Sequence, residues 1–306
     1  MLKFETLDVF TDAPFAGNPL AVVYDPDMTL TTEQMQTIAR EFNLSETIFV
    51  LPPQSPDETA TVRIFHPAAE MPFAGHPTLG CAVALAAREP GEGTKTIRLR
   101  TKAGLAECVV IRVSGSAASA RVTVPVLPNE AGPAPETQTL ADALGLRPGQ
   151  IGFAELRPAH WVGGPDFVFV PVADRATLAA ARITQPTFDA LKSERIWGSV
   201  YLFTPDGDGL QFRSRMFAGE GFEDPATGSA SAILAGVLNA AGLLVEGSNV
   251  IHLRQGFEMG RPSHVTVHAE VSKASLSQVG IAGQAVPVMR GELSPPPVGQ
   301  PIRSDA

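Results

Sequence analysis

Three ionisable residues stand at places in the sequence where their side chains could do acid–base chemistry. His76 and Asp224 each come directly before a proline, and each proline opens a stretch of small and apolar residues that predicts a helix. Glu46 opens a run of apolar and β-branched residues that predicts a strand. An imidazole and two carboxylates around one pocket are enough to move a proton at a carbon next to a carboxyl group.

Both predicted helices could also bind an acidic ligand. The N-terminus of a helix has free backbone N–H groups and the positive end of the helix dipole, which together favour carboxylates. Gly75 precedes His76, and Gly228 follows Asp224 closely, so a ligand could approach the main chain at both places. Small acidic metabolites are the predicted occupants.

Each of these residues also has a purely structural interpretation. Asp224 could be the N-cap of its helix, and His76 could simply stabilise a turn. Glu46 alone would more often be a solvated acid at a strand end. Thr78 and Ser229 could bond to their own backbone in the first helical turn. A polar residue at both helix starts favours the functional interpretation of His76.

The two helices belong to a repeated pattern. Each copy has a strand, a turn rich in Pro and Gly, a helix of small residues and a further alternating strand. The predicted helices cover 77–88 and 226–241, and the strands after them cover 96–100 and 250–254. The sequence therefore predicts two α/β halves related by a pseudo-twofold axis. Their helix starts could then face each other across one cleft, which is a preferred place for a small-molecule site.

The boundary between the halves is predicted from composition. Segment 125–135 is rich in proline and small residues, as expected for a connection. We therefore expect a first half over 1–127 and a second half over 128–292. A tail over 293–306, with three consecutive prolines and few apolar residues, is predicted to be disordered.

The other elements follow from periodicity and capping signals. Thr31 or Thr32 is the predicted cap of a helix that ends near Phe42. The remaining predicted helices cover 140–144, 175–180 and 188–194, and the strands cover 2–10, 19–24, 46–50, 59–65, 106–113, 120–124, 167–172, 199–203, 213–217 and 264–271, with a last strand ending near residue 289.

Composition and charge exclude several classes of protein. The 306 residues, 44% of them apolar, suffice for two globular domains of ordinary size. The net charge of -9 is spread along the chain without a basic run, so we expect no nucleic-acid partner. No apolar run could span a bilayer and residues 1–5 lack a signal sequence, so we expect no membrane partner and a cytoplasmic location. Two cysteines, Cys81 and Cys108, fit a reducing compartment.

The sequence predicts neither a metal site nor a cofactor site. The six histidines do not cluster. His264 and His268 are four residues apart, but the residues between them predict a strand, which would separate them by roughly 13 Å. Neither a Walker loop nor a G-x-G-x-x-G after a strand is present. We therefore expect no metal and no cofactor.

Several blocks of the sequence, taken in order, resemble the signatures of the phenazine-biosynthesis PhzF-like isomerase family. The resemblance extends over almost the whole chain, and the blocks cover 10–23, 43–47, 72–78, 223–230 and the segment Gly256-x-x-x-Gly260-Arg261-Pro262-Ser263. It implies the diaminopimelate-epimerase-like α/β (α+β) fold. In that fold two similar halves each wrap a mixed, strongly curved β-sheet around a central helix, and the site lies in the cleft between them.

The resemblance also implies roles for individual residues. The family's catalytic residues fall on Glu46, His76 and Asp224, and its substrate-contacting serine falls on Ser229. The other residues that it implies around the substrate are Ser45, Gly75, Pro77, Thr78, Thr227 and Gly228. Related racemases have thiols at the two helix starts, where this chain has glycines, so two-thiol racemisation is not expected. The family resemblance further implies a homodimer.

We therefore expect a cofactor-independent isomerase. In this hypothesis Glu46 removes a proton from an activated C–H of a small carboxylated metabolite, amino-hydroxy ring acids included, and returns it elsewhere on the same substrate. His76 and Asp224 would orient the substrate and stabilise charge. The alternative is a small-molecule-binding or protein-interaction module with the same fold and no catalysis. The loop over 218–222 is shorter than in many family members. The sequence therefore does not decide how the pocket is closed or which substrate it fits.

Overall fold

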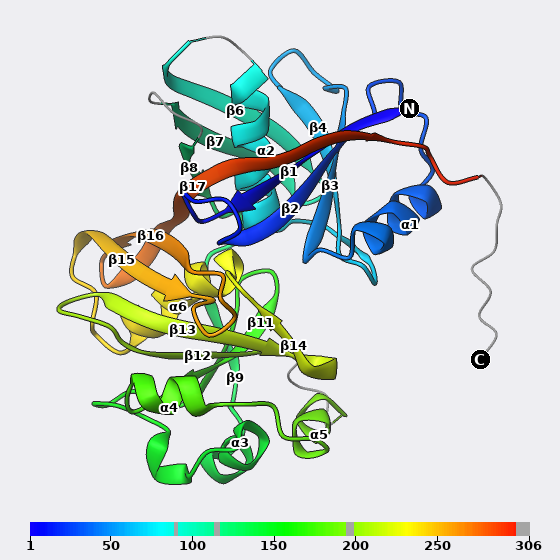
Figure 1. The fold of residues 1–306 in the computed structure, drawn as a ribbon. Helices are drawn as coiled ribbons and strands as arrows, with labels where there is room; N and C mark the ends of the chain where they lie inside the picture. The colour runs from blue at the N-terminus through cyan, green and yellow to red at the C-terminus, as the bar shows by residue number, and fades with distance from the viewer. Residues whose placement is uncertain (89–90, 113–116, 194–198, 298–306) are drawn as a thin grey trace.

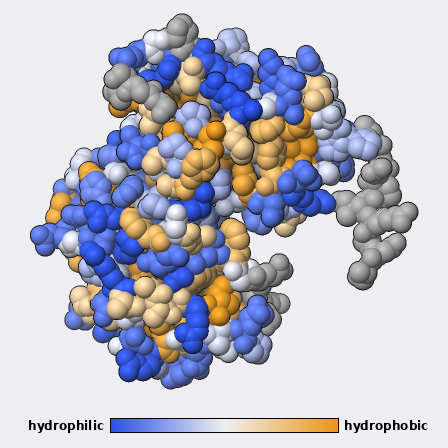
Figure 2. All heavy atoms as spheres, in the orientation of Figure 1, coloured by the Kyte–Doolittle hydropathy of each residue, from blue (hydrophilic) through white to orange (hydrophobic). Residues whose placement is uncertain are grey.

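The computed structural model of the chain describes residues 1–88, 91–112, 117–193 and 199–297. The elements form two lobes, and the long strand β17 (Ser275–Leu293) runs from one lobe into the other (Figure 1). The space-filling view shows an indentation at the side of the molecule where the lobes meet (Figure 2). Within the described residues, every helix is too short or too polar to cross a membrane.

The first lobe is a closed barrel of strands around one helix. Strand β17 closes this barrel, because its residues 280–285 pair with β8 and its residues 285–293 pair with β1. The elements of this lobe are β1 (Leu2–Val9), β2 (Asn18–Tyr24), α1 (Thr32–Phe42), β3 (Glu46–Leu51), β4 (Ala60–Phe65), β5 (Glu70–Met71), α2 (Gly75–Arg88), β6 (Gly93–Thr101), β7 (Gly104–Arg112) and β8 (Ala118–Thr123).

The second lobe wraps a second curved sheet around α6. Its strands are β9 (Asn129–Gly132), β10 (Ala159–Val162), β11 (Asp166–Pro171), β12 (Ser199–Pro205), β13 (Gln211–Ala218), β14 (Phe222–Asp224), β15 (Gly247–Gln255) and β16 (Ser263–Ser272). Its helices are α3 (Thr137–Leu144), α4 (Arg175–Ala180), α5 (Thr187–Ser193) and α6 (Gly228–Ala240), with 3-10 turns at Pro148–Gln150 and Gly219–Gly221.

The strand pairing confirms the internal duplication. In the first lobe the strands lie in the order β17-β1-β2-β3-β4-β6-β7-β8. Neighbouring strands pair antiparallel, except β2 with β3 and β4 with β6, which are parallel. In the second lobe the strands lie in the order β9-β10-β11-β12-β13-β15-β16-β17. Their parallel pairs, β11 with β12 and β13 with β15, stand at the same two positions of the order, and the other pairs are antiparallel. In both copies a short strand, β5 or β14, leads into the central helix. The predicted fold, two similar halves with a mixed sheet around a central helix, is therefore confirmed.

The central helices are made of small residues because they are surrounded by sheet. In α2 a Cβ on Gly80 would lie 2.6 Å from Leu20 Cδ2, and in α6 a Cβ on Gly236 would lie 2.6 Å from the Trp161 ring. The two helices thus approach the strands more closely than any larger residue allows. A helix that is apolar around its whole circumference is expected inside such a core.

The predicted starts of both central helices were wrong by two residues, in opposite directions. Helix α2 begins at Gly75, because its first hydrogen bond runs from Thr78 N to Ala74 O. Helix α6 begins only at Gly228, because its first hydrogen bond runs from Ser231 N to Thr227 O. His76 therefore lies inside the first turn of α2, whereas Asp224 ends strand β14, well before α6.

Most other elements were predicted correctly, and Thr31 caps α1 with its side chain as expected. Strands β5, β9, β10 and β14 were missed because they are only two to four residues long; β14 lies where a turn was predicted. Helix α3 begins three residues before its predicted start. The predicted ends at Val113 and Glu194 lie outside the described residues, as do residues 298–306 of the predicted tail.

The division of the chain at residue 127 stays a prediction. Strand pairing continues across the boundary, because β17 belongs to the sheets of both lobes. Leu293, the first residue of the predicted tail, still belongs to β17 and pairs with Leu2, and residues beyond it also contact the first lobe. Gln34 donates a hydrogen bond to Pro296 O at 2.5 Å, and the Ser294 hydroxyl lies 3.3 Å from Met1 Sδ.

Candidate active site

The starts of α2 and α6 line one small cavity between the lobes. Its volume is about 60 Å³. Its polar lining comes from Glu46, His76, Asp224, Thr227 and Ser229, and its apolar lining comes from Met71, Phe73, Ala74, Val124, Val126, Pro128, Pro165, Ala226, Ala232, Ile233 and Ile281, with Gly75, Gly163 and Gly228. The predicted meeting of the two helix starts is therefore a feature of the structure.

Two glycines allow the helix starts to come this close. A Cβ on Gly75 would lie 3.9 Å from the carbonyl carbon of Gly228 and 2.5 Å from Ile281 Cδ1. A Cβ on Gly228 would lie 3.0 Å from the same Ile281 atom and 3.1 Å from the Phe10 ring. Any larger residue at either helix start would therefore fill the space in which a ligand must lie.

The buried His76 and the partly exposed Glu46 form a pair on the first-lobe side of the cavity, where their side chains are 5% and 14% exposed. Glu46 is the first residue of β3, and His76 lies in the first turn of α2. His76 Nδ1 is 3.1 Å from Glu46 Oε2, but the contact lacks hydrogen-bond geometry. Within the described residues, His76 Nε2 also has no hydrogen-bond partner. This pair therefore keeps hydrogen-bonding capacity that a ligand could use.

Burial shifts both members of this pair toward their neutral forms. It lowers the pKa of His76 to about 3, against a smaller raising effect of a backbone hydrogen bond with Pro19. Burial, and then the negative charge of Asp224, raise the pKa of Glu46 well above its ordinary value. At neutral pH His76 is thus a neutral imidazole, which can orient a substrate by hydrogen bonding but supplies no positive charge.

Asp224 is held very differently on the second-lobe side. Its carboxylate accepts hydrogen bonds from Asn18 Nδ2 at 2.8 Å, Ser45 Oγ at 3.1 Å and Thr227 Oγ1 at 2.7 Å. Burial raises its pKa to about 6, although these three side chains lower it. The N-cap interpretation of Asp224 is wrong, because Thr227 occupies the N-cap position and makes no side-chain cap bond.

Two residues that fix this arrangement were not identified from the sequence. Asn18 bonds Asp224 from the first lobe. Gln255 accepts a hydrogen bond from Thr227 N at 3.1 Å and donates to Asp224 O at 2.7 Å. Asn18 lies in segment 10–23, which resembles the family and was a signal for it, whereas Gln255 directly precedes the segment that begins at Gly256 and had no such signal. Their partners are nonetheless 206 and about 30 residues away, so contacts of this kind cannot be found from spacing.

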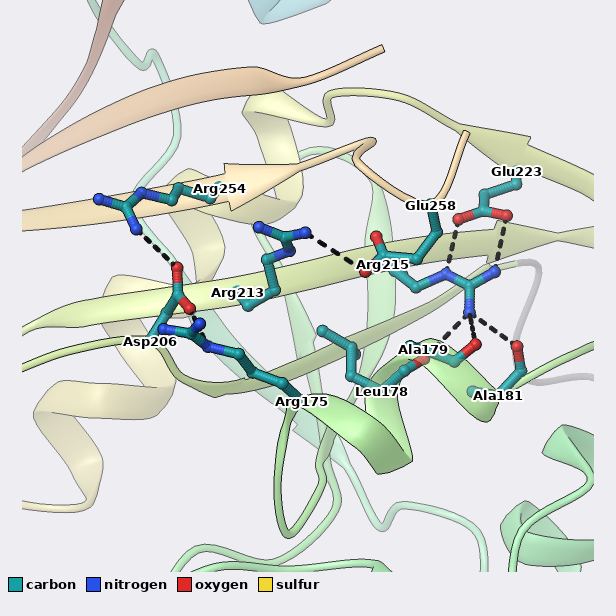
Figure 3. A network of polar contacts seen from close by, with 10 residues as sticks. All are labelled: Arg175, Leu178, Ala179, Ala181, Asp206, Arg213, Arg215, Glu223, Arg254 and Glu258. Carbon is teal, nitrogen blue, oxygen red and sulfur yellow. Dashed lines mark hydrogen bonds and ion pairs between the residues drawn. The ribbon is translucent and has the colours of Figure 1, made fainter. Parts of the chain in front are cut away.

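Arg215, on β13, connects the neighbouring strand β14 with the end of α4 (Figure 3). Its guanidinium donates to both carboxylate oxygens of Glu223, the neighbour of Asp224, at 2.8 and 2.9 Å. Its remaining nitrogen donates to three carbonyl oxygens at the end of α4, those of Leu178, Ala179 and Ala181. This network attaches β14, and with it the backbone of Asp224, to the body of the second lobe.

Seven of the ten predicted site residues line the cavity: Glu46, Gly75, His76, Asp224, Thr227, Gly228 and Ser229. Three do not. Ser45 lies behind the wall and bonds to Asp224. Thr78 is fully buried and donates to Ala74 O at 2.7 Å, which is the structural interpretation considered for it. Pro77 is buried in the first turn of α2.

The two helix starts offer different numbers of backbone donors. The first hydrogen bond of α6 runs from Ser231 N to Thr227 O, so the N–H groups of residues 228–230 precede it. In α2 only Gly75 and His76 offer such N–H groups, because the next residue is a proline. Among the described residues that line the cavity, none is Lys or Arg. A carboxylate bound here would therefore rely on the helix starts.

Comparisons with known proteins agree with this architecture. The phenazine biosynthesis-like protein family matches residues 7–291. An uncharacterized isomerase of Mesorhizobium japonicum is 41% identical, over 94% of this chain and 96% of its own length. A trans-2,3-dihydro-3-hydroxyanthranilate isomerase of Pseudomonas chlororaphis is 37% identical, over 96% and 99%. The crystal structure of a PhzF-family phenazine biosynthesis protein of Bacillus anthracis superimposes with a TM-score of 0.83, at 26% identity over 96% and 99%.

These matches define the class of the protein: it is an isomerase built on two epimerase-like halves. The chain belongs to the phenazine biosynthesis-like family. The resemblance found in the sequence blocks is thereby confirmed, and so is the expectation of an isomerase.

Proposed function

We propose that this isomerase moves a proton on a small carboxylated ring metabolite, amino-hydroxy ring acids included, without a cofactor. The observation that most supports the proposal is the underbonded pair of Glu46 and His76 opposite a fixed carboxylate, Asp224. The apolar remainder of the cavity suits the hydrocarbon part of a ring. The name of the Pseudomonas chlororaphis relative supplies a first candidate from this class, trans-2,3-dihydro-3-hydroxyanthranilate.

In the proposed mechanism Glu46 is the group that moves the proton. Its ionised form takes a proton from an activated C–H, the electron pair shifts through the conjugated substrate, and the protonated Glu46 returns the proton at another carbon. A raised pKa suits this double role, because a weakly acidic carboxyl group is a stronger base when ionised. Neutral His76 would orient the substrate by a hydrogen bond from or to its imidazole.

The remaining residues would bind and orient the substrate. The N–H groups near Gly75 and those near Gly228 and Ser229 would hold the carboxylate. Pro77 lies in the first turn of α2 and has no backbone N–H of its own. Thr78 donates to Ala74 O and so closes this first turn. Ser45 and Thr227 would act through Asp224, which they bond. The cavity is smaller than typical ligand pockets of roughly 300–1,000 Å³, so the lobes would part for entry and close over the substrate.

The assembly and the location of the protein are part of the proposal. We expect a homodimer, as the family resemblance implies, and a cytoplasmic enzyme of small-molecule biosynthesis. Both thiols, Cys81 and Cys108, are buried and free, which is compatible with a reducing compartment.

The test is proton exchange in heavy water, followed by NMR, with trans-2,3-dihydro-3-hydroxyanthranilate and a set of related ring acids. The proposal expects isomerisation of at least one of them, with deuterium at the carbon that receives the proton to the extent that the Glu46 carboxyl exchanges with solvent before it returns the proton. Glu46→Gln is the matched control and should show neither. Binding without isomerisation or exchange by the wild-type chain would instead support the non-catalytic module, and equal isomerisation by both proteins would refute the role of Glu46.

A further inference from the structure

Two segments that resemble family signatures have no part in the proposed chemistry. Residues 10–18 run from the end of β1 to the first residue of β2 in the first lobe, and residues 256–263 run from the end of β15 to the first residue of β16 in the second. In the structure they lie against each other: Gly17 N donates to Pro262 O at 3.1 Å, although the two residues are far apart in the sequence. The loop over 10–18 ends at Asn18, which reaches Asp224.

Arg261 joins the two segments with its side chain. It makes three hydrogen bonds to the first lobe, from Nε to Gly17 O at 2.8 Å and from Nη2 to Ala16 O at 2.7 Å and to Asp8 Oδ1 at 2.5 Å. The other Asp8 oxygen accepts from Phe15 N at 2.6 Å, inside the same loop. One guanidinium thus fixes both the carbonyls and the carboxylate that define the shape of the loop.

The backbone of this loop is constrained at both of its ends. Gly17 has a φ of +65°, and a Cβ there would lie 2.3 Å from Val9 O, so the turn before Asn18 requires glycine. At the other end Phe10 N donates to Gln284 O at 2.7 Å, and His264 N donates to Phe10 O at 2.8 Å. The loop is therefore held at both ends by residues near the start of β16 and on β17.

The side-chain amide of Asn18 can adopt only one of its two flipped orientations. It is fully buried, and its Nδ2 donates to Asp224 Oδ1 at 2.8 Å and to Ala226 O at 2.9 Å. Both partners are acceptors, so a flipped amide would point its oxygen at two oxygens. Among the described residues, Asn18 Oδ1 has no hydrogen-bond partner. A buried acceptor without a partner costs stability, which indicates that this residue serves the orientation of Asp224 rather than folding.

We propose that Asn18 is a positioning residue for Asp224, and that Arg261 holds Asn18 in place from the opposite lobe. The inference rests on the proposed function, because it matters for catalysis only if the charge and direction of Asp224 do. It adds a connection between the lobes: the first lobe orients the carboxylate of the second, and the second lobe shapes the loop that does so.

The first test is Asn18→Ala. A hydrogen bond to a charged group is lost, so we expect kcat with trans-2,3-dihydro-3-hydroxyanthranilate to fall about 10- to 100-fold with little change in KM. In the free protein, carbon-13 NMR of the aspartate carboxyls, assigned with Asp224→Asn, should show the pKa of Asp224 moving above about 6. The other ionisable groups near Asp224 are Glu46, His76, Glu223 and Tyr201, and this variant leaves all four in place.

The second test is Arg261→Gln, alone and combined with Asn18→Ala. The single change should lower kcat by less than Asn18→Ala and shift the pKa of Asp224 in the same direction. The double variant should be no worse than Asn18→Ala, because Arg261 acts through Asn18. Arg261→Lys keeps the charge but not the fork of donors, and it should restore only part of the loss. The matched control, Arg98→Gln, breaks an exposed ion pair with Glu107 and should change neither quantity.

The outcomes separate the inference from the proposed function. If Asp224→Asn is as active as the wild-type chain, the proposed role of Asp224 is wrong. If Asp224→Asn is inactive while Asn18→Ala keeps normal kcat and an unchanged Asp224 pKa, the inference alone is wrong. Independent, additive effects of Asn18→Ala and Arg261→Gln would also overturn it. Should Asn18→Ala fail to fold, the NMR shift in the more exposed Arg261 variants decides the question.

Discussion

The starts of the two central helices occupy equivalent places in the duplicated fold, yet their polar groups are bonded in opposite ways. At the start of α2, Glu46 and His76 touch each other without a proper hydrogen bond, and each keeps a buried polar atom without a partner in the described structure. Before the start of α6, Asp224 accepts three side-chain hydrogen bonds. The same scaffold therefore supports one underbonded and one fully bonded site.

This difference suggests a division of labour between the lobes. A group that must give up and take back a proton needs unsatisfied bonding capacity, whereas a group that orients the substrate needs fixed neighbours. The pKa shifts agree with it. Burial acts on Glu46 without opposing donors, whereas the three donors around Asp224 limit the rise of its pKa to about 6. The following predictions test or sharpen this comparison.

Glu46→Gln should have the largest effect. The amide keeps the shape of the side chain and removes the proton acceptor, so we expect kcat to fall by about 10²–10⁴-fold while the fold and substrate binding persist. Steady-state kinetics and a binding titration with the substrate found in the exchange assay measure both. Glu41→Gln, on the exposed side of α1, is the control. Near-normal turnover by Glu46→Gln would move the proton-transfer role to another group.

Gly228→Val tests whether the space between the helix starts is needed for the ligand. Because a ligand could approach the main chain at Gly228, we expect a larger side chain there to weaken binding more than folding. The structure adds a folding cost, because the new Cβ would lie 3.0 Å from Ile281 Cδ1 and 3.1 Å from the Phe10 ring. We expect binding to weaken at least about tenfold and stability to fall by about 1–3 kcal/mol. Calorimetric titration and chemical denaturation measure the two effects.

The control for this change is Gly149→Val, since a Cβ at Gly149 would meet nothing within 4 Å. It should change neither binding nor stability by a comparable amount. If Gly228→Val binds the substrate normally, the α6 start is not part of the binding site, and the comparison of the two helix starts loses its functional meaning.

These sites also show what could be predicted from the sequence. The duplicated order of strands and helices could be predicted, because each element has its own local periodicity and the two copies of the pattern resemble each other. Glu46, His76 and Asp224 stand out for the same reason, as polar residues next to apolar elements. The two similar α/β halves and the three ionisable residues were therefore accessible before any coordinates, whereas the particular fold and the substrate-contacting residues followed from the family resemblance.

The hydrogen bonds that distinguish the two helix starts were not accessible in this way. Asp224 looked like a helix cap, because a proline and small residues follow it directly. The structure ends β14 at Asp224 and begins α6 only at Gly228, and Gln255 from another strand binds both Thr227 N and Asp224 O between the two elements. Asn18 reaches Asp224 from 206 residues away. Only tertiary packing decides such partners, so a sequence predicts which groups gather but not which of them are satisfied.

A smaller effect is expected on stability and its dependence on pH. The pKa of Glu46 is raised in the folded state, so the wild-type chain loses stability as the pH rises from about 4.3, the ordinary value, through that raised pKa. Glu46→Gln does not titrate and escapes this loss. Its stability relative to wild type should therefore increase with pH, which urea denaturation at pH 5 and pH 8 can measure. A constant difference in stability between the two proteins would show that folding does not raise the pKa of Glu46.

The smallest effect should come from blocking the thiols, which lie near neither helix start. Cys81 and Cys108 are fully buried, and burial raises the pKa of both thiols, that of Cys108 to about 12. Because the thiolate is the reactive form, a thiol reagent should label neither cysteine in the native protein and leave turnover unchanged. Denatured protein should be labelled at both positions, which mass spectrometry can verify. Inactivation in proportion to native labelling would mean that a thiol takes part in the reaction, and the division of labour between Glu46 and Asp224 would then be incomplete.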